Sequence, residues 1–165
     1  MRLRYILFIL LPLIICGCTK KEEPKKIPDY DSDIKCVSTI EEDNDGDLVL
    51  YTSNIYINID DNNKVTNTIY QSISDSTALD KATVDLTNQF LDIYKDINGI
   101  EAEAAAIDNK LVITIKYDYT NIDLNIVKKK LGSILEDDNI LKKTNKLPFS
   151  YDEFKKYSLK GYECK

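Results

Sequence analysis

Residues 100–119, IEAEAAAIDNKLVITIKYDY, decide the fold because they predict one hairpin with a fixed register. Two runs rich in aliphatic residues flank Asp108-Asn109, and both of these residues tolerate the left-handed backbone of a tight turn. This two-residue turn pairs Ala104 with Ile113, and the neighbouring pairs also set an alanine against a larger side chain. Small residues opposite large ones interdigitate well beneath a helix. The hairpin therefore predicts an antiparallel sheet with one face covered by helices.

Three further strands are expected before this hairpin. Residues 34–42 and 48–59 flank the turn sequence Asn-Asp-Gly-Asp, and their alternation of apolar and polar residues predicts one inner face. A four-residue turn between them pairs Cys36 with Ile55 on that inner face.

The third strand is predicted at residues 65–74, after a short polar loop. Pairing Ile59 with Val65 and Ile55 with Ile69 gives this strand its register. The pairing predicts that Val65, Ile69 and Ile73 share the inner face.

Helices are expected at residues 77–98, 121–135 and 150–157. The first opens with the capping pair Thr77 and Asp80 and carries an apolar stripe at spacings of three and four residues, which predicts its buried side. The stripe comprises Leu79, Ala82, Leu86, Phe90, Ile93 or Tyr94, and Ile97. The last helix begins at a capping box, Ser150 with Glu153, and a hydrophobic staple of Phe149 with Phe154 also marks its start. The order βββαββαα predicts an α+β fold, an antiparallel sheet of about five strands with helices packed on one face.

The N-terminal residues predict a signal that directs the chain out of the cytoplasm. Two arginines precede an apolar run of about eleven residues, shorter than the roughly 20 that span a bilayer but suited to a signal peptide. The run ends in Ile15-Cys16-Gly17-Cys18, which resembles the cleavage site of bacterial lipoprotein signals. Gly17 supplies the small residue required before the modified cysteine, whereas Ile15 before Cys16 is too bulky. The resemblance implies a diacylglyceryl thioether on Cys18, and two acyl chains give a stable anchor.

These segments predict a division of the chain. Residues 1–17 are the signal peptide, residues 18–33 the lipidated N-terminus with a flexible tether, and residues 34–165 a single α+β domain. The anchor places the domain on the extracytoplasmic face of the cell membrane. Abundant Ile, Asn, Lys and Tyr favour a Gram-positive-like host.

Charge and cysteine content narrow the classes of function. Residues 18–165 hold 20 lysines against 28 acidic residues, a net charge of about −8, which argues against nucleic acid as a partner. Removal of Cys16 and acylation of Cys18 leave Cys36 and Cys164, and outside the cytoplasm such a pair is more often a disulfide than two free thiols. A redox pair is the alternative, but the chain has no Cys-x-x-Cys motif.

A longer resemblance involves residues 98–124, NGIEAEAAAIDNKLVITIKYDYTNIDL. This stretch resembles the YehR-like family of small bacterial lipoproteins in the glycine that opens a hairpin and in an aromatic-Asp-Tyr ending, here Tyr117-Asp118-Tyr119. The resemblance extends over roughly residues 48–135. It implies a fold and a location, and it carries over no catalytic residue.

The acidic stretch EEDNDGD at residues 41–47 resembles half of a calcium loop. Asp43 and Asp45 take positions three and five, and Gly46 falls at position six as such loops require. Position twelve is Thr52, where a bidentate glutamate is needed. Asp43, Asp45 and Asp47 are therefore weak candidates for a metal site, and a plain hairpin turn explains the same residues. We expect no other metal and no cofactor.

Tyr56 and Tyr70 are candidates for a ligand surface. In the proposed register they lie near each other on the outer face among threonines, where their rings suit a sugar or a peptide. An ordinary solvated face is the alternative.

The sequence offers little for catalysis. It has no histidine, no Gly-x-Ser-x-Gly and no phosphate-binding glycine loop. We expect a non-enzymatic lipoprotein that is anchored through Cys18 and binds an envelope protein, a peptide or another envelope component. A small-ligand or calcium-binding module is the alternative, and a hydrolase that uses paired carboxylates is a third hypothesis.

Overall fold

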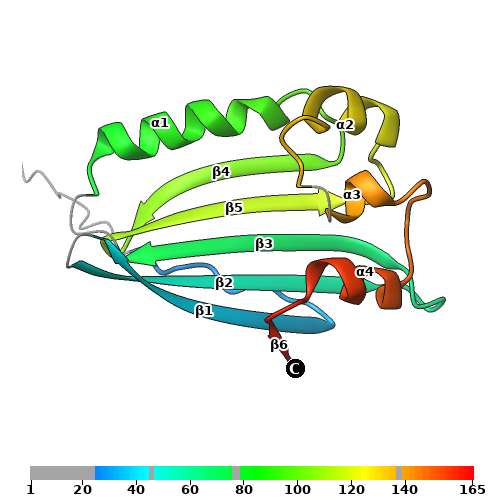
Figure 1. The fold of residues 1–165 in the computed structure, drawn as a ribbon, viewed down its shortest axis with the longest axis horizontal. Coiled ribbons are helices and arrows are strands. Elements are labelled where there is room, and N and C mark those ends of the chain that lie inside the picture. Colours follow the sequence, from blue (N-terminus) through cyan, green and yellow to red (C-terminus); the bar gives the residue numbers. More distant parts are fainter. Residues whose placement is uncertain (1–24, 45–46, 76–78, 137–138) are drawn as a thin grey trace, which may run out of the picture.

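The computed structural model describes residues 25–44, 47–75, 79–136 and 139–165. They form an antiparallel sheet of six strands with helices, the α+β fold that the sequence predicts (Figure 1). Within these ranges no helix is both long enough and apolar enough to cross a bilayer. The elements are β1 (Ile34–Asn44), β2 (Asp47–Ile59), β3 (Val65–Asp75), α1 (Lys81–Leu91), the 3-10 helix η1 (Asp92–Tyr94), β4 (Ile100–Ile107), β5 (Lys110–Asp118), α2 (Leu124–Leu131), α3 (Ile140–Lys143), α4 (Tyr151–Ser158) and β6 (Glu163–Cys164).

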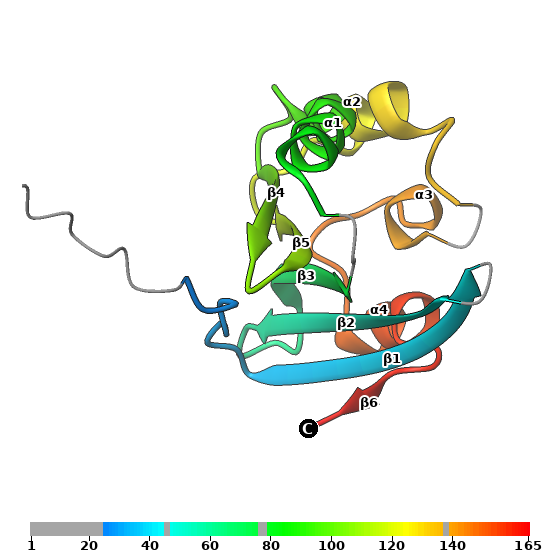
Figure 2. The same cartoon turned by 90° about the vertical axis from the view of Figure 1, so that its left-hand side faces the viewer.

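The strands lie in the order β4-β5-β3-β2-β1-β6. The five predicted strands are all present, and the two-residue β6 adds a sixth beside β1. The sheet is strongly curved, and α1, α2, α3 and α4 lie on its inner side (Figure 2). We call the opposite side, which carries Tyr56, Gln71 and Lys116, the open face.

The two predicted hairpins have the predicted registers. Cys36 pairs with Ile55 in the first and Ala104 with Ile113 in the second. Asp108 and Asn109 have φ angles of 52° and 59°, so the turn uses the left-handed backbone that these residue types tolerate. The sequence was therefore sufficient to fix both hairpins.

The predicted register between β2 and β3 is wrong beyond its first pair. Ile59 pairs with Val65 as predicted, but a bulge next to Asn58 shifts the remaining pairs, and Ile55 lies opposite Tyr70 instead of Ile69. A shift of one residue moves every later side chain to the other face. Tyr70 therefore faces the helices, and Ile69 lies on the open face.

Helix α1 begins at its Asp80 cap, whose carboxylate accepts from the backbone N–H of Thr83 at 2.7 Å, but it is rotated relative to the prediction. No residue within Lys81–Leu91 is buried, and the predicted inner stripe points outward: Leu86 is 54% and Phe90 67% exposed. The expectation that this stripe packs on the sheet is wrong for Ala82, Leu86 and Phe90, whereas Ile97, which follows the helix, is buried in the core as predicted. The cause is a pair of hydrogen bonds that join the side chain of Asn88 to the backbone of Ala104 on the edge strand β4.

The core lies between the sheet and helices α2, α3 and α4. Ser150 caps α4 by accepting from the backbone N–H of Glu153 at 3.2 Å, and Phe149 stacks on Phe154 with ring centroids 5.8 Å apart, as the capping box and staple predict. The buried members of the core are Cys36, Ile55, Ile57, Val65, Ile97, Ile100, Tyr117, Tyr119, Val127, Leu131, Leu135, Ile140, Leu141, Phe149, Phe154 and Leu159.

The predicted disulfide between Cys36 and Cys164 is present, with a sulfur–sulfur distance of 2.04 Å. Cys36 is fully buried, and the bond holds the C-terminus against β1. Lys35 and Lys165 add two backbone hydrogen bonds, of 3.1 and 2.9 Å. The ends of the domain are thus joined by one covalent and two polar links.

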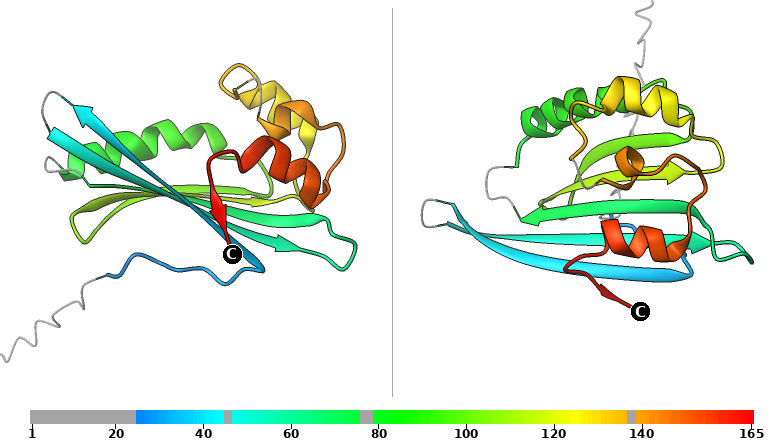
Figure 3. Two further views of the ribbon diagram at one scale, coloured as in Figure 1. Left: turned by 60° about the horizontal axis from the view of Figure 1, so that its bottom comes forward. Right: turned by 45° about the vertical axis from the view of Figure 1, so that its right-hand side comes forward.

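Residues 28–33, which we call the strap, precede β1 and pack on the open face. They run along the side of the sheet opposite the helices (Figure 3, left). These residues were expected to belong to a flexible tether ending at residue 33. The packed part of the chain therefore begins earlier than the predicted boundary at residue 34.

Candidate functional site

A row of polar side chains crosses the middle of the open face. Asn54 pairs with Gln71, and Gln71 with Thr114, on the neighbouring strands β2, β3 and β5. All three side chains are buried, and Gln71 is only 1% exposed. Asn54 Nδ2 donates to Gln71 Oε1 at 2.9 Å. A buried amide must satisfy its hydrogen bonds within the protein, so whatever covers this row must also offer it a partner.

The strap provides that cover. Gln71 Nε2 donates to the backbone carbonyl oxygen of Pro28 at 2.9 Å, and the Tyr30 ring packs edge-on against Tyr56 with centroids 5.2 Å apart. At the end of the strap, the Asp33 backbone N–H donates to Asn58 Oδ1 at 3.3 Å. The open face thus recognises an extended segment through its backbone and one aromatic side chain.

The carboxylate of Asp29, in the strap, also accepts hydrogen bonds from side chains of the sheet. Lys35 Nζ and the Tyr56 hydroxyl donate to Asp29 Oδ1 at 2.7 and 2.9 Å. The hydrogen bond from Lys35, supported by that from Tyr56, lowers the pKa of the Asp29 carboxyl. Burial raises the pKa of Tyr56, which keeps its hydroxyl protonated as a donor. The contact therefore selects a carboxylate at this position.

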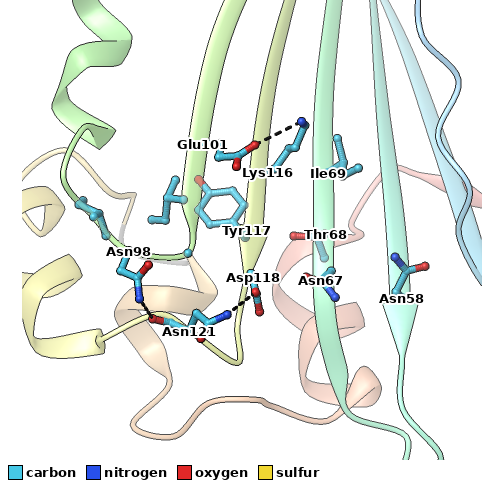
Figure 4. Close-up of a pocket in the computed structure, with 13 residues that line it drawn as sticks. Asn58, Asn67, Thr68, Ile69, Asn98, Glu101, Lys116, Tyr117, Asp118 and Asn121 are labelled. Carbon is cyan, nitrogen blue, oxygen red and sulfur yellow. Dashed lines mark hydrogen bonds and ion pairs between the residues drawn. The ribbon is translucent and has the colours of Figure 1, made fainter.

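A pocket lies beside the strap, on the same face and at the end of the sheet (Figure 4). Its volume is about 560 Å³. Asn58, which binds the strap, is also one of its walls, so the pocket continues the surface that the strap occupies. It is lined by Asn58, Asn67, Thr68, Ile69, Ile97, Asn98, Gly99, Ile100, Glu101, Lys116, Tyr117, Asp118 and Asn121.

The start of β4 and the end of β5 shape this pocket. Gly99 has φ +81°, and an added Cβ would lie 2.8 Å from the Asp118 carbonyl oxygen, so only glycine allows this approach. The Gly99 carbonyl accepts from the Asp118 backbone N–H at 2.7 Å. Asn98 Nδ2 donates to the Asn121 carbonyl at 3.4 Å, which joins the start of β4 to the turn that follows β5. These contacts place the side chains of Asn98 and Asn121 at the rim of the pocket.

The charged groups of the pocket are already paired. Lys116 and Glu101 form an ion pair of 3.3 Å. The Asp118 carboxylate accepts from Asn121 Nδ2 at 2.6 Å and from Thr120, and the Thr120 hydroxyl contributes most to lowering its pKa. The other polar groups of the pocket include side-chain amides and backbone groups, which both donate and accept hydrogen bonds. This chemistry suits recognition of a polypeptide backbone.

The structure separates the two tyrosines that were predicted to share a ligand surface. Tyr56 lies on the open face under the strap, whereas Tyr70 faces the helices and contacts Tyr117 edge-on at 5.6 Å. The bulge beside Asn58 causes this separation. Tyr56 therefore belongs to the candidate site, whereas Tyr70 does not.

Several predicted sites fall outside what the structure describes. Cys18 and Asp45 lie beyond the described residues, and the side chains of Asp43 and Asp47 are not described. Among the described residues, no cluster of three or more Cys, Asp or Glu side chains is arranged to hold a metal. The calcium hypothesis therefore stays a prediction.

A second cavity, of about 490 Å³, lies on the helix side. Tyr70, Tyr117 and Tyr119 form part of its wall, and the Tyr119 hydroxyl is hydrogen-bonded to Thr68 at 2.8 Å. Another part of the wall is formed by residues on either side of residues 137–138, which are not described. We assign this cavity no ligand.

The amides of the open face were missed in the sequence. Asn54, Asn58, Asn67 and Gln71 occupy alternate positions that a half-exposed strand normally gives to solvent. The available signal was their repetition: polar amides at 54 and 58 on one strand and at 67 and 71 on the next.

Comparison of the chain with protein-family models, curated proteins and solved structures found no significant match.

Proposed function

We propose that this protein is an extracytoplasmic lipoprotein, anchored through Cys18, that binds an extended peptide segment of an envelope protein on its open face without catalysing a reaction. One observation carries the proposal: the buried amide of Gln71 binds the backbone carbonyl of Pro28 in an extended segment. The strap is thus an internal example of the kind of ligand that this face accepts.

The pocket beside the strap supports the same choice of ligand. A polypeptide offers one donor and one acceptor in each residue, and side-chain amides match both. Asn58 connects the strap to the pocket, and Asn67 and Asn121 continue the amide surface across it. A partner segment that lies beside the strap would therefore meet the same chemistry that binds the strap.

The signal sequence supports the location. The ten residue-to-residue steps from Cys18 to Pro28 reach at most about 35 Å when fully extended. Because the strap fixes Pro28 on the open face, a lipid on Cys18 would keep that face within this distance of the membrane. The proposed ligand is therefore a segment of a protein that is exposed near the membrane surface.

Site-specific photocrosslinking of the full-length chain in its native membranes tests this function. A photoreactive residue at Asn67, in the pocket, should give an adduct with a segment of a second polypeptide. The same residue at Asp152, which is exposed on α4 on the helix side, serves as the matched control. Identical adducts at both positions, or an adduct only at Asp152, would contradict the proposal.

A further inference from the structure

The two ends of the strap are held by different kinds of contact. At its C-terminal end, the Asp33 backbone N–H donates to the Ile57 carbonyl at 3.1 Å, and the Asp33 carboxylate accepts from the Ile59 backbone N–H at 2.8 Å. Within the described part of the chain, Asp31 and Ser32 make no hydrogen bond or ion pair with the sheet. Residues 28–30 therefore contact the sheet as a separate group, which can leave while Asp33 stays in place.

Lys35 and Tyr56 hold the acidic side chain of this group. They lie opposite each other on β1 and β2, and the Lys35 ammonium lies 5.0 Å from the centre of the Tyr56 ring. Both side chains donate to the same oxygen of Asp29, at 2.7 and 2.9 Å. Hydrogen bonds to an ionised acceptor are stronger than those to a neutral one, so this pair selects a carboxylate over a neutral side chain.

The next residue of the strap adds an aromatic ring. Tyr30 packs edge-on against Tyr56, which is only 2% exposed beneath the strap. A smaller side chain at this position would lose the ring contact and expose Tyr56 to water. Gln71, in contrast, binds the carbonyl of Pro28, which every residue offers, so it adds affinity without a preference for sequence.

The contacts of residues 28–30 are open to a competitor. The side chain of Asp29 is 75% exposed and that of Lys35 40%, and exposed ion pairs contribute little to stability. The pocket at Asn58 and Asn67 lies beside the bound strap, so a second segment can contact the open face before the strap leaves. Because the strap is tethered, it competes at a high effective concentration and lowers the apparent affinity for any partner.

We propose that the strap occupies the place of the partner segment, and that this segment carries an acidic residue immediately before an aromatic one and displaces residues 28–30 on binding. The inference rests on the proposed function and adds to it the side chains of the ligand and the competitor that it replaces. Lys35 and Tyr56 are then the specificity-determining residues of the open face. A segment that matches only one of them fails to replace the strap.

Peptide binding to the full-length chain tests the specificity. The strap peptide IPDYDSD, residues 27–33, is titrated into the chain whose residues 25–32 are replaced by glycine and serine. The peptide IPYDDSD keeps the composition but reverses the order of the acidic and aromatic residues, and it should bind about tenfold more weakly. Equal affinities would overturn the specificity and leave the proposed function intact, whereas no binding of either peptide would contradict both.

Charge reversal at Lys35 assigns the selection to this residue. In the same chain, Lys35→Glu should lower the affinity for IPDYDSD about tenfold and raise the affinity for IPKYDSD, in which lysine replaces the first aspartate. Circular dichroism checks that the variant keeps its fold. If IPKYDSD binds the variant no better than it binds the chain with Lys35, then Lys35 does not select the carboxylate.

Displacement is measured in the full-length chain that keeps its strap. Asp29→Asn weakens the contact of the strap with Lys35 and should raise the apparent affinity for IPDYDSD about fivefold. Asp31→Asn is the matched control, because it removes the same charge at a strap residue that does not contact the sheet, and it should leave the affinity unchanged. Equal affinities of the two variants would show that the peptide binds beside the strap and would contradict its displacement.

Discussion

Gln71 lies at the centre of the open face and joins the strap to the sheet: its Nε2 donates to the Pro28 carbonyl oxygen at 2.9 Å, 43 residues away in sequence. Its Oε1 accepts from Asn54 at 2.9 Å, so the amide is fixed in orientation before it meets the strap. With Gln71 only 1% exposed, these bonds form away from water, where an unpaired group is costly.

Replacing Gln71 with Leu should release the strap. The change leaves the Asn54 donor and the Pro28 carbonyl without their partner, at a cost of about 1–3 kcal/mol. Faster tryptic cleavage after Lys26, together with a lower midpoint of urea unfolding, measures both effects. Asn67→Leu, which alters the pocket without touching the strap, is the control. Equal cleavage rates in the two variants would show that Gln71 does not hold the strap.

The Asp29 contact should make strap binding depend on acid pH. Because the Lys35 hydrogen bond lowers the pKa of Asp29 in the folded protein, its stabilising effect is present above the usual value of 3.8 and is lost as pH falls below it. The Tyr30 ring resonances should therefore shift toward free values in that acid range. Asp29→Asn should show no such transition, and an identical acid transition in this variant would assign it to another group.

The bulge between β2 and β3 shows what the sequence was unable to specify. The β1–β2 and β4–β5 hairpins are joined by sequences whose residue types predict the pairing, and both registers are as predicted. The β2–β3 connection has no such turn, and the alternation of its side chains fits two registers that differ by one residue. The bulge beside Asn58 selects between these two registers.

Helix α1 shows a different limit. Its apolar residues recur every three or four positions, and this pattern predicts a buried side correctly only if the sheet covers that side. The two hydrogen bonds of Asn88 to Ala104 instead turn that side away from the sheet. The candidate site was hidden for a related reason. Amides on alternate strand positions predict a solvated face, and only the fold shows that the chain's own residues 28–33 lie across them.

Loss of the Cys36–Cys164 disulfide should lower stability. The bond closes a loop of 128 residues, and Cys164→Ser should cost about 2–5 kcal/mol in the free energy of unfolding because the unfolded chain gains freedom. Urea unfolding with and without reductant measures the loss, and reductant should not destabilise the variant further. An intact mass that does not rise by two hydrogens on reduction of the native chain would show that the bond is absent.

The buried tyrosines should delay alkaline ionisation. Burial raises the pKa values of Tyr117 and Tyr119 well above their usual 10.0, so their contribution to stability is complete below pH 10 and is lost as pH rises above it. Tyrosinate absorbance should show an early phase from exposed rings and a late phase that coincides with loss of the circular dichroism of the fold. Complete titration near pH 10 with the fold intact would contradict their burial.

Binding of the strap sequence in trans tests the central claim, that the open face recognises an extended peptide. A synthetic peptide of residues 25–33, KKIPDYDSD, is added to the full-length chain whose residues 25–32 are replaced by glycine and serine. We expect saturable NMR shifts at Asn54, Tyr56 and Gln71, and an affinity about tenfold lower with Gln71→Leu. No saturable shift, or equal binding of a scrambled peptide, would contradict the claim.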